Sequence, residues 1–230
     1  MKKNYQNKTY YSQKNRMLDR HKYIIKLIEK SFKKNDKIEI IDFGCGSGEL
    51  AFFLNQSFPK STYLGIDIDQ SLIRLAKKKK INNSTFQDKS LLEFTQKKKY
   101  DVVIACGMLS FFSDFKPILK KVISFLKNSN SKVYIFGRFN SANIDTKIQI
   151  RDNTESNSWR EGFNSYSTKT ISLFLKRFNK KFRFIKFNLK VNLKKGKSLT
   201  RTFTILNKNK KMILNRANII AEFFFLIIKK

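Results

Sequence analysis

The glycine-rich stretch IIDFGCGSG, residues 40–48, constrains the fold of this chain more than any other feature. An apolar run ends there, and three glycines follow at alternate positions: Gly44, Gly46 and Gly48. Glycines lack a Cβ atom, so the backbone can turn sharply and press against a ligand. A helix that begins at such a turn presents free N–H groups and partial positive charge. The sequence therefore predicts a buried strand, a ligand-binding loop and a helix over residues 38–58.

The chain continues as alternating strands and helices as far as residue 139. Apolar runs predict strands at 38–43, 62–68, 84–87, 100–106 and 131–139. Helical spacing of apolar residues predicts helices at 21–32 and 49–58, after Asp69, and after Ser113 or Asp114. This alternation is typical of α/β proteins with a doubly wound, mostly parallel sheet.

The remaining residues break this rhythm. The stretch 140–166 is polar and contains the single tryptophan, Trp159. Ser167 is expected to cap a further helix. Strands are then expected at 182–191, 201–206, 211–214 and 222–229, with a turn at 207–210. The C-terminal portion is therefore predicted to be antiparallel.

The spacing of the glycines differs from that of a dinucleotide-binding loop. Dinucleotide-binding loops require Gly-x-Gly-x-x-Gly, whereas here Glu49 takes the last required position and the third glycine, Gly48, comes one residue early. The second strand ends at Asp67, whose carboxylate can accept two hydrogen bonds from ribose hydroxyls. Asp69 suits the N-cap of the next helix better than Asp67 does.

Four segments together resemble the class I S-adenosylmethionine-dependent methyltransferases. The loop after Asp42 resembles motif I, and YLGID at 63–67 resembles the strand that ends in the ribose-binding acid, here Asp67. FQD at 86–88 resembles the adenine-edge motif, and ACGML at 105–109 resembles the segment beside the cofactor. The resemblance implies a seven-stranded methyltransferase sheet with an N-terminal helix and a lid or hairpin insertion, and S-adenosyl-L-methionine as cofactor. It implies the following cofactor-binding residues: Asp42, Gly44, Cys45, Gly46, Gly48, Asp67, Ile68, Asp88, Lys89, Cys106 and Gly107.

We expect one methyltransferase domain over residues 1–230. It would comprise an N-terminal arm and helix (1–36), a cofactor-binding core (37–139), a substrate-lid insertion (140–166), and a C-terminal helix with antiparallel strands (167–230). The insertion follows the fifth strand, so it projects over the carboxyl ends of the strands, where ligands bind in open α/β sheets.

The insertion and the strand before it supply the candidate substrate-binding residues. Arginines there can grip an acidic substrate through two parallel hydrogen bonds. The alternative is a solvated loop that Trp159 anchors to the core. The candidates are Arg138, Asn140, Arg151, Trp159, Arg160 and Asn164.

The acceptor class follows mainly from missing motifs. Residues 105–108 read ACGM, not the Asn/Asp/Ser-Pro-Pro-aromatic motif of base amine methyltransferases, and neither cysteine follows a proline, as a cytosine-C5 nucleophile would. A small-molecule or glycan/lipid-precursor acceptor is therefore predicted. The catalytic residue is unassigned, because positioning supplies much of the rate of an in-line methyl transfer.

The net charge of +32 leaves one alternative open. Clustered lysines can release counterions from phosphates, so an RNA-binding protein or RNA methyltransferase is the second hypothesis. The lysines are spread along the chain, however, and accompany abundant Asn, Ile and Phe, as in a compositionally biased sequence. Nucleic acid is therefore not favoured as a partner, and the oligomeric state is not indicated.

Further residue types bear on compartment and metals. No signal peptide or membrane span is evident, so a cytoplasmic protein is expected. Cys45, Cys106 and the single histidine, His21, are too few for a structural zinc site, and no metal is predicted. We expect both cysteines to fill a tight pocket beside the cofactor and His21 to lie on the surface of the first helix.

Overall fold

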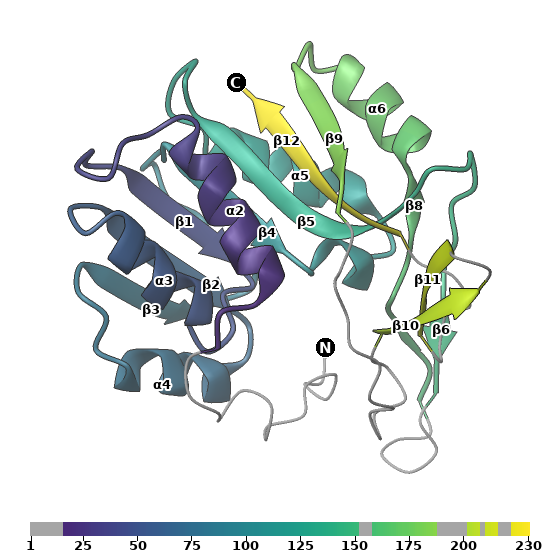
Figure 1. The fold of residues 1–230 in the computed structure, drawn as a ribbon, viewed down its shortest axis with the longest axis horizontal. Helices are drawn as coiled ribbons and strands as arrows, with labels where there is room; N and C mark the ends of the chain where they lie inside the picture. Colours follow the sequence, from purple (N-terminus) through teal and green to yellow (C-terminus); the bar gives the residue numbers. More distant parts are fainter. Residues whose placement is uncertain (1–15, 152–157, 188–201, 208–209, 216–221) are drawn as a thin grey trace.

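The computed structural model describes residues 16–151, 158–187, 202–207, 210–215 and 222–230. Its main sheet has the order β3-β2-β1-β4-β5-β12-β9, and the short β8 pairs with β5 outside this path. Figure 1 shows the strands side by side. They are β1 (Glu39–Phe43), β2 (Thr62–Asp67), β3 (Ser84–Asp88), β4 (Val102–Cys106), β5 (Lys132–Asn140), β8 (Tyr166–Ser167), β9 (Phe182–Lys186) and β12 (Glu222–Lys229).

Strand directions match the sequence expectation. Strands β1 to β5 pair in parallel, whereas β12 lies antiparallel between β5 and β9. The predicted doubly wound, mostly parallel sheet with an antiparallel C-terminal portion is therefore confirmed. Because β1 to β5 are parallel, their carboxyl ends form one edge of the sheet.

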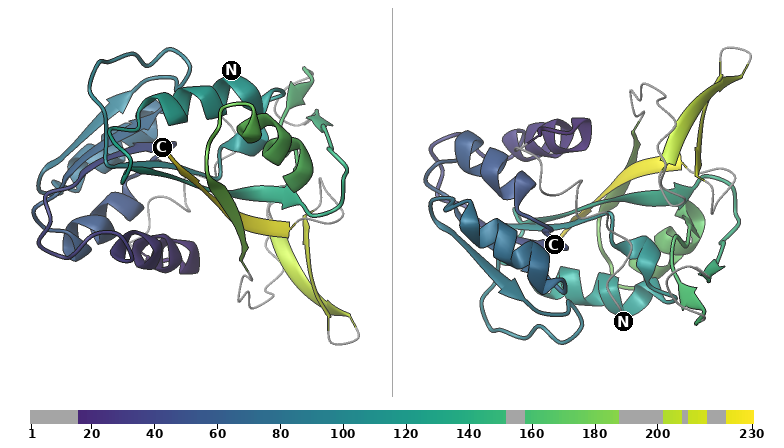
Figure 2. Two further views of the ribbon diagram at one scale, coloured as in Figure 1. Left: turned by 90° about the horizontal axis from the view of Figure 1, so that it is seen from above. Right: turned by 90° about the horizontal axis from the view of Figure 1, so that it is seen from below.

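Helices cover both faces of the sheet. In Figure 2, α2 and α3 lie on one face, and α5 and α6 lie on the other. Helix α4 belongs to the first layer, because its Ile73 and Ala76 share a core cluster with residues of α2 and α3. The helices are α2 (Asp19–Glu29), α3 (Glu49–Ser57), α4 (Gln70–Lys78), α5 (Phe115–Ser124) and α6 (Thr168–Lys176), with a 3-10 turn, η1 (Leu109–Phe111).

Side-chain caps start three of these helices where the sequence predicts. Asp69 accepts from the Ser71 N–H at 2.8 Å, and Asp114, not Ser113, accepts from the Lys116 N–H at 2.9 Å. Ser167 accepts from the Thr170 N–H at 2.9 Å. Each cap satisfies one of the N–H groups that a helix leaves without an intrahelical partner.

The insertion after β5 is a small ordered layer in its described part. β6 (Gln149–Ile150) and β7 (Arg160–Glu161) form a two-stranded ladder, and Thr146 bridges Ser165. Trp159 is 62% exposed, so the interpretation that it anchors the insertion to the core is wrong. Asn164 is the anchor: it is fully buried, and its amide donates to Phe112 O and accepts from the Ile148 N–H.

The C-terminal hairpin stands apart from the main sheet. β10 (Thr202–Asn207) pairs antiparallel with β11 (Lys210–Asn215), and Figure 2 shows this hairpin projecting from the body. The centre of the predicted turn, 208–209, and the end of the strand expected at 182–191 lie outside the described residues.

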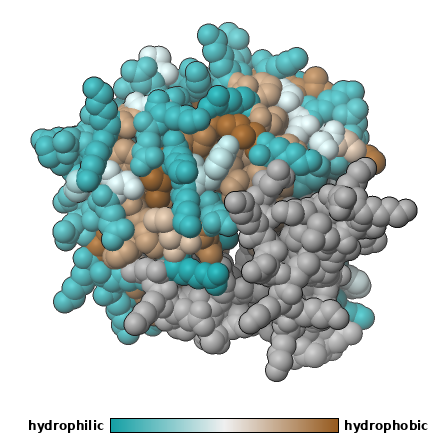
Figure 3. Space-filling model, in the orientation of Figure 1, coloured by the Kyte–Doolittle hydropathy of each residue, from teal (hydrophilic) through white to brown (hydrophobic). Residues whose placement is uncertain are grey.

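Hydrophilic side chains dominate the face seen in Figure 3, with apolar atoms in patches between them. Hydrophilic residues are therefore spread over this face instead of forming one stripe. None of the helices in the described part of the chain is both long and apolar enough to cross a bilayer.

Candidate functional site

The glycine loop adopts the backbone that its sequence requires. Gly44, Gly46 and Gly48 have φ of +76°, +57° and +76°, in the left-handed region that side chains disfavour. The loop is fastened to β2, since the N–H groups of Gly44 and Cys45 both donate to Ile66 O, at 2.7 and 3.1 Å. A Cβ on Gly48 would lie 3.2 Å from Ala76 Cβ and Phe86 Cζ, so the loop also packs closely onto its support.

Asp67 fastens the glycine loop to the end of β2. It is buried at the end of β2, where Oδ2 accepts from the Gly46 N–H at 2.8 Å and Oδ1 accepts from the Asp69 N–H at 2.9 Å. Burial raises the pKa of this carboxyl, and the backbone hydrogen bonds oppose that rise. A carboxylate oxygen has more than one lone pair, so both oxygens can still accept from the hydroxyls of a ligand.

Asp42 is the second carboxyl at the loop. It is buried, and its Oδ2 accepts from the Tyr63 hydroxyl at 2.6 Å. Within the described residues its Oδ1 has no hydrogen-bond partner. Burial raises the pKa of Asp42 to about 7, the Tyr63 hydrogen bond lowers it, and the charge of Asp67 raises it. An unsatisfied buried acceptor beside a glycine cradle suits a ligand that brings a donor or a positive charge.

This pKa makes a pH-dependent prediction for the ligand-free protein. The folded-state pKa of Asp42 lies above its unfolded value of 3.8, so the folded protein binds the proton more tightly. The stabilising contribution of the neutral group is present at pH 4 and is lost as pH rises through about 7. We expect Asp42→Asn, which mimics the neutral acid, to gain about 2–3 kcal/mol over wild type between pH 5 and pH 8, since this window covers about two of the pKa units at about 1.4 kcal/mol each. Urea unfolding at the two pH values measures this difference; an equal difference at both would contradict the assignment.

The two cysteines flank the same region. Cys45 is buried in the loop, Cys106 ends β4, and the charge of Asp42 raises the pKa of both thiols. Burial is the largest cause in each case, and it places the pKa of Cys106 at about 12. Both thiols therefore stay neutral at physiological pH, which suits packing and disfavours nucleophilic attack.

The other predicted cofactor residues lie at the same carboxyl edge. Ile68 is 53% exposed directly after β2, and Asp88, the exposed last residue of β3, is the register partner of Asp67. Lys89 is exposed after β3. Gly107 follows β4 with φ +75°, and a Cβ built on it would meet no atom within 4 Å. The structure thus brings all eleven predicted cofactor residues to the ends of β1 to β4.

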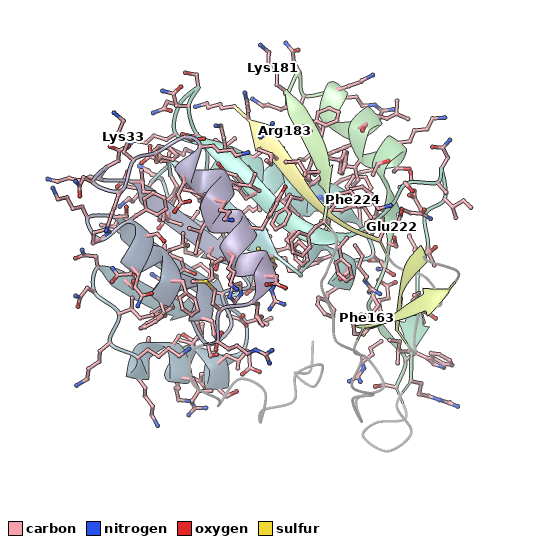
Figure 4. All side chains as sticks on the ribbon, in the orientation of Figure 1. Lys33, Phe163, Lys181, Arg183, Glu222 and Phe224 are labelled. Atoms are coloured by element: carbon pink, nitrogen blue, oxygen red, sulfur yellow. The ribbon has the colours of Figure 1, made fainter. Side chains whose placement is uncertain are left out.

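The six predicted substrate residues are not brought together in this way. Arg138 is 6% exposed near the end of β5, with its guanidinium carbon 4.9 Å from the Phe163 ring centroid. Figure 4 shows Phe163 at the end of the sheet where Glu222 also lies. Arg151 stacks on Trp159 at 5.3 Å, where both are exposed, and Arg160 is in β7. The amides of Asn140 and Asn164 bond to the framework of the insertion.

One residue near the site, His21, lies elsewhere than predicted, and two, Tyr63 and Phe163, have roles that the sequence did not predict. His21 is 6% exposed, so the prediction of a surface residue is wrong: it packs beside Phe53 of α3, and burial lowers its pKa to about 3. The spacing of His21 with the buried Ile24, Ile25 and Ile28 was the available signal. Tyr63 and Phe163 carried no comparable signal, because their roles depend on contacts across strands and loops.

No group of three or more His, Cys, Asp and Glu side chains in the described ranges is placed to hold a metal ion. The candidate site therefore consists of glycine backbone, buried carboxyls and one buried guanidinium. Such a set can bind hydroxyl, amino and anionic groups.

Comparison with known proteins finds similarity to methyltransferases. The family described as "Methyltransferase domain" matches residues 41–130. The chain is 29% identical over 162 residues to an uncharacterized protein of Methanocaldococcus jannaschii, covering 68% of this chain and 38% of that one. It is 24% identical over 128 residues to the malonyl-[acyl-carrier protein] O-methyltransferase of Bacillus anthracis, covering 55% and 48%. The chain thus spans about half, or less, of the length of these relatives.

A solved structure shares the fold at low sequence identity. Magnesium protoporphyrin IX methyltransferase from Synechocystis PCC 6803, solved with bound S-adenosylmethionine, superposes with a TM-score of 0.54 at 13% identity. The match covers 92% of this chain and 78% of that one. At this identity the similarity shows the fold alone.

Proposed function

Because this chain belongs to the class I, S-adenosylmethionine-dependent methyltransferase family, we propose that it transfers a methyl group to a small-molecule or glycan/lipid-precursor acceptor. S-adenosyl-L-methionine is the cofactor, and it supplies a methyl carbon activated by a neighbouring sulfonium. The observation that carries the proposal is the glycine loop tied by Gly46 N–H to the buried Asp67. The acceptor approaches from the ends of β4 and β5, beside Gly107.

The residues present fit this cofactor. The backbone of Gly44, Gly46 and Gly48 would hold the methionine half, because positive φ angles favour glycine and a backbone without Cβ atoms can approach a ligand closely. Asp67 would accept from the ribose hydroxyls, and Asp88 would accept from the adenine amine. The free Oδ1 of Asp42 and the open space at Gly107 are the features that a bound ligand would satisfy.

The chain's own residues contribute position and electrostatics more than acid–base chemistry. Holding two reacting groups in line supplies much of the barrier reduction for a displacement at carbon. The neutral thiols of Cys45 and Cys106 exclude water beside the loop and do not attack. Asp42 and Asp67 place negative charge where a positively charged ligand gains from it.

We propose a single methyltransferase domain whose insertion, residues 140–166, forms a wall of the acceptor site. Asn164 supports this, since its buried amide fastens the insertion to the segment that follows β4. Arg138 is the acceptor-binding residue of the six candidates. The exposed pair of Arg151 and Trp159 lies next to the β6–β7 ladder and is not part of the proposed site.

The direct test is calorimetric titration of the folded protein with S-adenosylmethionine and S-adenosylhomocysteine. We expect one site, with dissociation constants in the micromolar range for both. A product-detected screen with labelled cofactor against size-fractionated extracts then identifies the acceptor. A folded protein that binds neither ligand would contradict the proposal.

A further inference from the structure

The guanidinium of Arg138 is buried without a counter-charge among the described residues. The Arg138 side chain is buried, and neither of its terminal nitrogens has a hydrogen-bond partner among the described residues. Burial alone lowers the pKa of this guanidinium, to about 10, so no carboxylate contributes and the group is still charged at neutral pH. Glu222, which lies opposite the neighbouring Phe139, is already paired with Lys186 at 2.6 Å.

A buried unpaired charge is strongly unfavourable unless something compensates it. The guanidinium packs against the face of Phe163, with its carbon 4.9 Å from the ring centroid. A cation–π contact in a desolvated site contributes on the order of 2 kcal/mol, whereas burying an ion costs several kcal/mol. The two terminal nitrogens are therefore available for a ligand.

The backbone at Phe163 is strained, and its strained conformation places the ring against the Arg138 guanidinium. Its φ is +61°, a left-handed conformation that is an outlier for a bulky residue. The hydrogen bonds of the next residue hold it there, since Asn164 N–H donates to Ser110 O at 2.8 Å and its amide donates to Phe112 O. Strain of this kind, about 1–3 kcal/mol, is typically retained at ligand sites.

The location matches the acceptor side of the proposed active site. Gly107 N–H donates to Phe136 O at 2.7 Å, so Arg138 lies two residues further along β5 toward the carboxyl edge. Phe163 also contacts Phe111, in the turn that follows Gly107, at 5.4 Å between ring centroids. Arg138, Phe163 and Phe111 thus connect the ends of β5 and β4.

We propose that the Arg138 guanidinium, stacked on Phe163, binds an anionic oxygen group of the methyl acceptor, a carboxylate or a phosphate, through two parallel hydrogen bonds. Guanidinium geometry matches both groups in this bidentate mode. That the bound anion belongs to a methyl acceptor rests on the proposed function, whereas the existence of an anion site at Arg138 does not. The proposal narrows the acceptor class to acidic molecules.

The test uses the full chain at constant ionic strength with three probes: succinate, inorganic phosphate and the uncharged succinamide. Salt at about 0.2 M screens weak binding to surface lysines. Thermal unfolding and calorimetry are measured for wild type, Arg138→Met and Arg183→Met. Arg183 is the matched control, because it is an exposed arginine of β9 that Figure 4 shows far from Phe163.

We expect wild type and Arg183→Met to be stabilised by succinate or by phosphate, but not by succinamide. Arg138→Met should lose that response, with binding at least about tenfold weaker. Without any probe, its Tm should be a few degrees above that of wild type, since the variant removes an uncompensated buried charge. The probe that acts distinguishes a carboxylate from a phosphate acceptor.

Two outcomes overturn the proposal: no response of wild type to either anion, or an equal response of all three proteins, which would mark surface binding. A lowered Tm of Arg138→Met with an unchanged anion response would assign a structural role instead. Titration with S-adenosylhomocysteine is run on the same samples. If S-adenosylhomocysteine does not bind, the methyltransferase proposal is contradicted, but the conclusion about the anion site is unaffected.

Discussion

Replacing Asp67 by alanine is expected to weaken the binding of S-adenosylmethionine by about 100-fold or more, with the fold retained. Asp67 accepts from the Gly46 N–H and is proposed to accept from two ribose hydroxyls. A hydrogen bond to a charged group contributes about 1.5–3 kcal/mol, and about 1.4 kcal/mol corresponds to a factor of ten. Losing two such bonds, and the support of the loop, gives the expected effect. Calorimetry with purified variants measures it.

Two further variants separate the role of the carboxylate from that of local structure. Asp67→Asn keeps one oxygen acceptor, so its affinity should fall between those of wild type and Asp67→Ala. Asp69→Ala removes the cap on Ser71 N–H, which is expected to lower stability by about 1 kcal/mol and change cofactor affinity less than twofold. If folded Asp67→Ala binds S-adenosylmethionine as tightly as wild type does, Asp67 does not contact the cofactor.

Local sequence patterns determined much of the fold. The last strand, Glu222–Lys229, begins and ends where the apolar run predicts, and the caps at Asp69 and Ser167 lie where predicted. These features depend on residues close together in the chain, so a single sequence carries them. The glycine spacing is of the same kind, because positive φ angles leave glycine as the residue of choice.

The remainder depended on contacts between distant segments. The alternative to a substrate role for Trp159 was that it anchors the insertion to the core, but the smaller Asn164 does this through hydrogen bonds to Ile148 and Phe112. His21 was expected at the surface because of its polarity, yet helix α2 turns that face toward α3. The Arg138–Phe163 contact joins β5 to the insertion, and no spacing in the sequence indicates it.

Replacing Gly65 by alanine is expected to lower both the stability of the protein and its affinity for the cofactor. A Cβ at Gly65 would lie 2.6 Å from Phe86 Cδ1 and 2.8 Å from Cys45 Sγ, inside normal contact distance. Both neighbours are buried, so they cannot swing away. Overpacking of this kind typically costs about 1–3 kcal/mol, equivalent to about 2–12 °C in Tm for a chain of this size.

The loss of affinity follows from where the displaced atoms lie. Cys45 is in the glycine loop, and the Phe86 ring supports Gly48, so shifting either one moves the cradle. Displacements near 1 Å at a ligand site can lower function about 100-fold, and we expect at least a tenfold loss of S-adenosylhomocysteine binding. Thermal unfolding and calorimetry on the same samples measure the two effects.

Gly137→Ala is the matched control. Gly137 is also a strand glycine, but its Cβ would meet only Phe139 Cε2, at 3.7 Å, which is ordinary contact. Alanine there should leave stability unchanged or raise it by about 0.5 kcal/mol, because it reduces the freedom of the unfolded chain. If Gly65→Ala and Gly137→Ala have the same Tm and the same affinity for S-adenosylhomocysteine, close packing at Gly65 does not position the glycine loop. A loss confined to Gly65→Ala ties cofactor affinity to the contact between β2, Cys45 and Phe86.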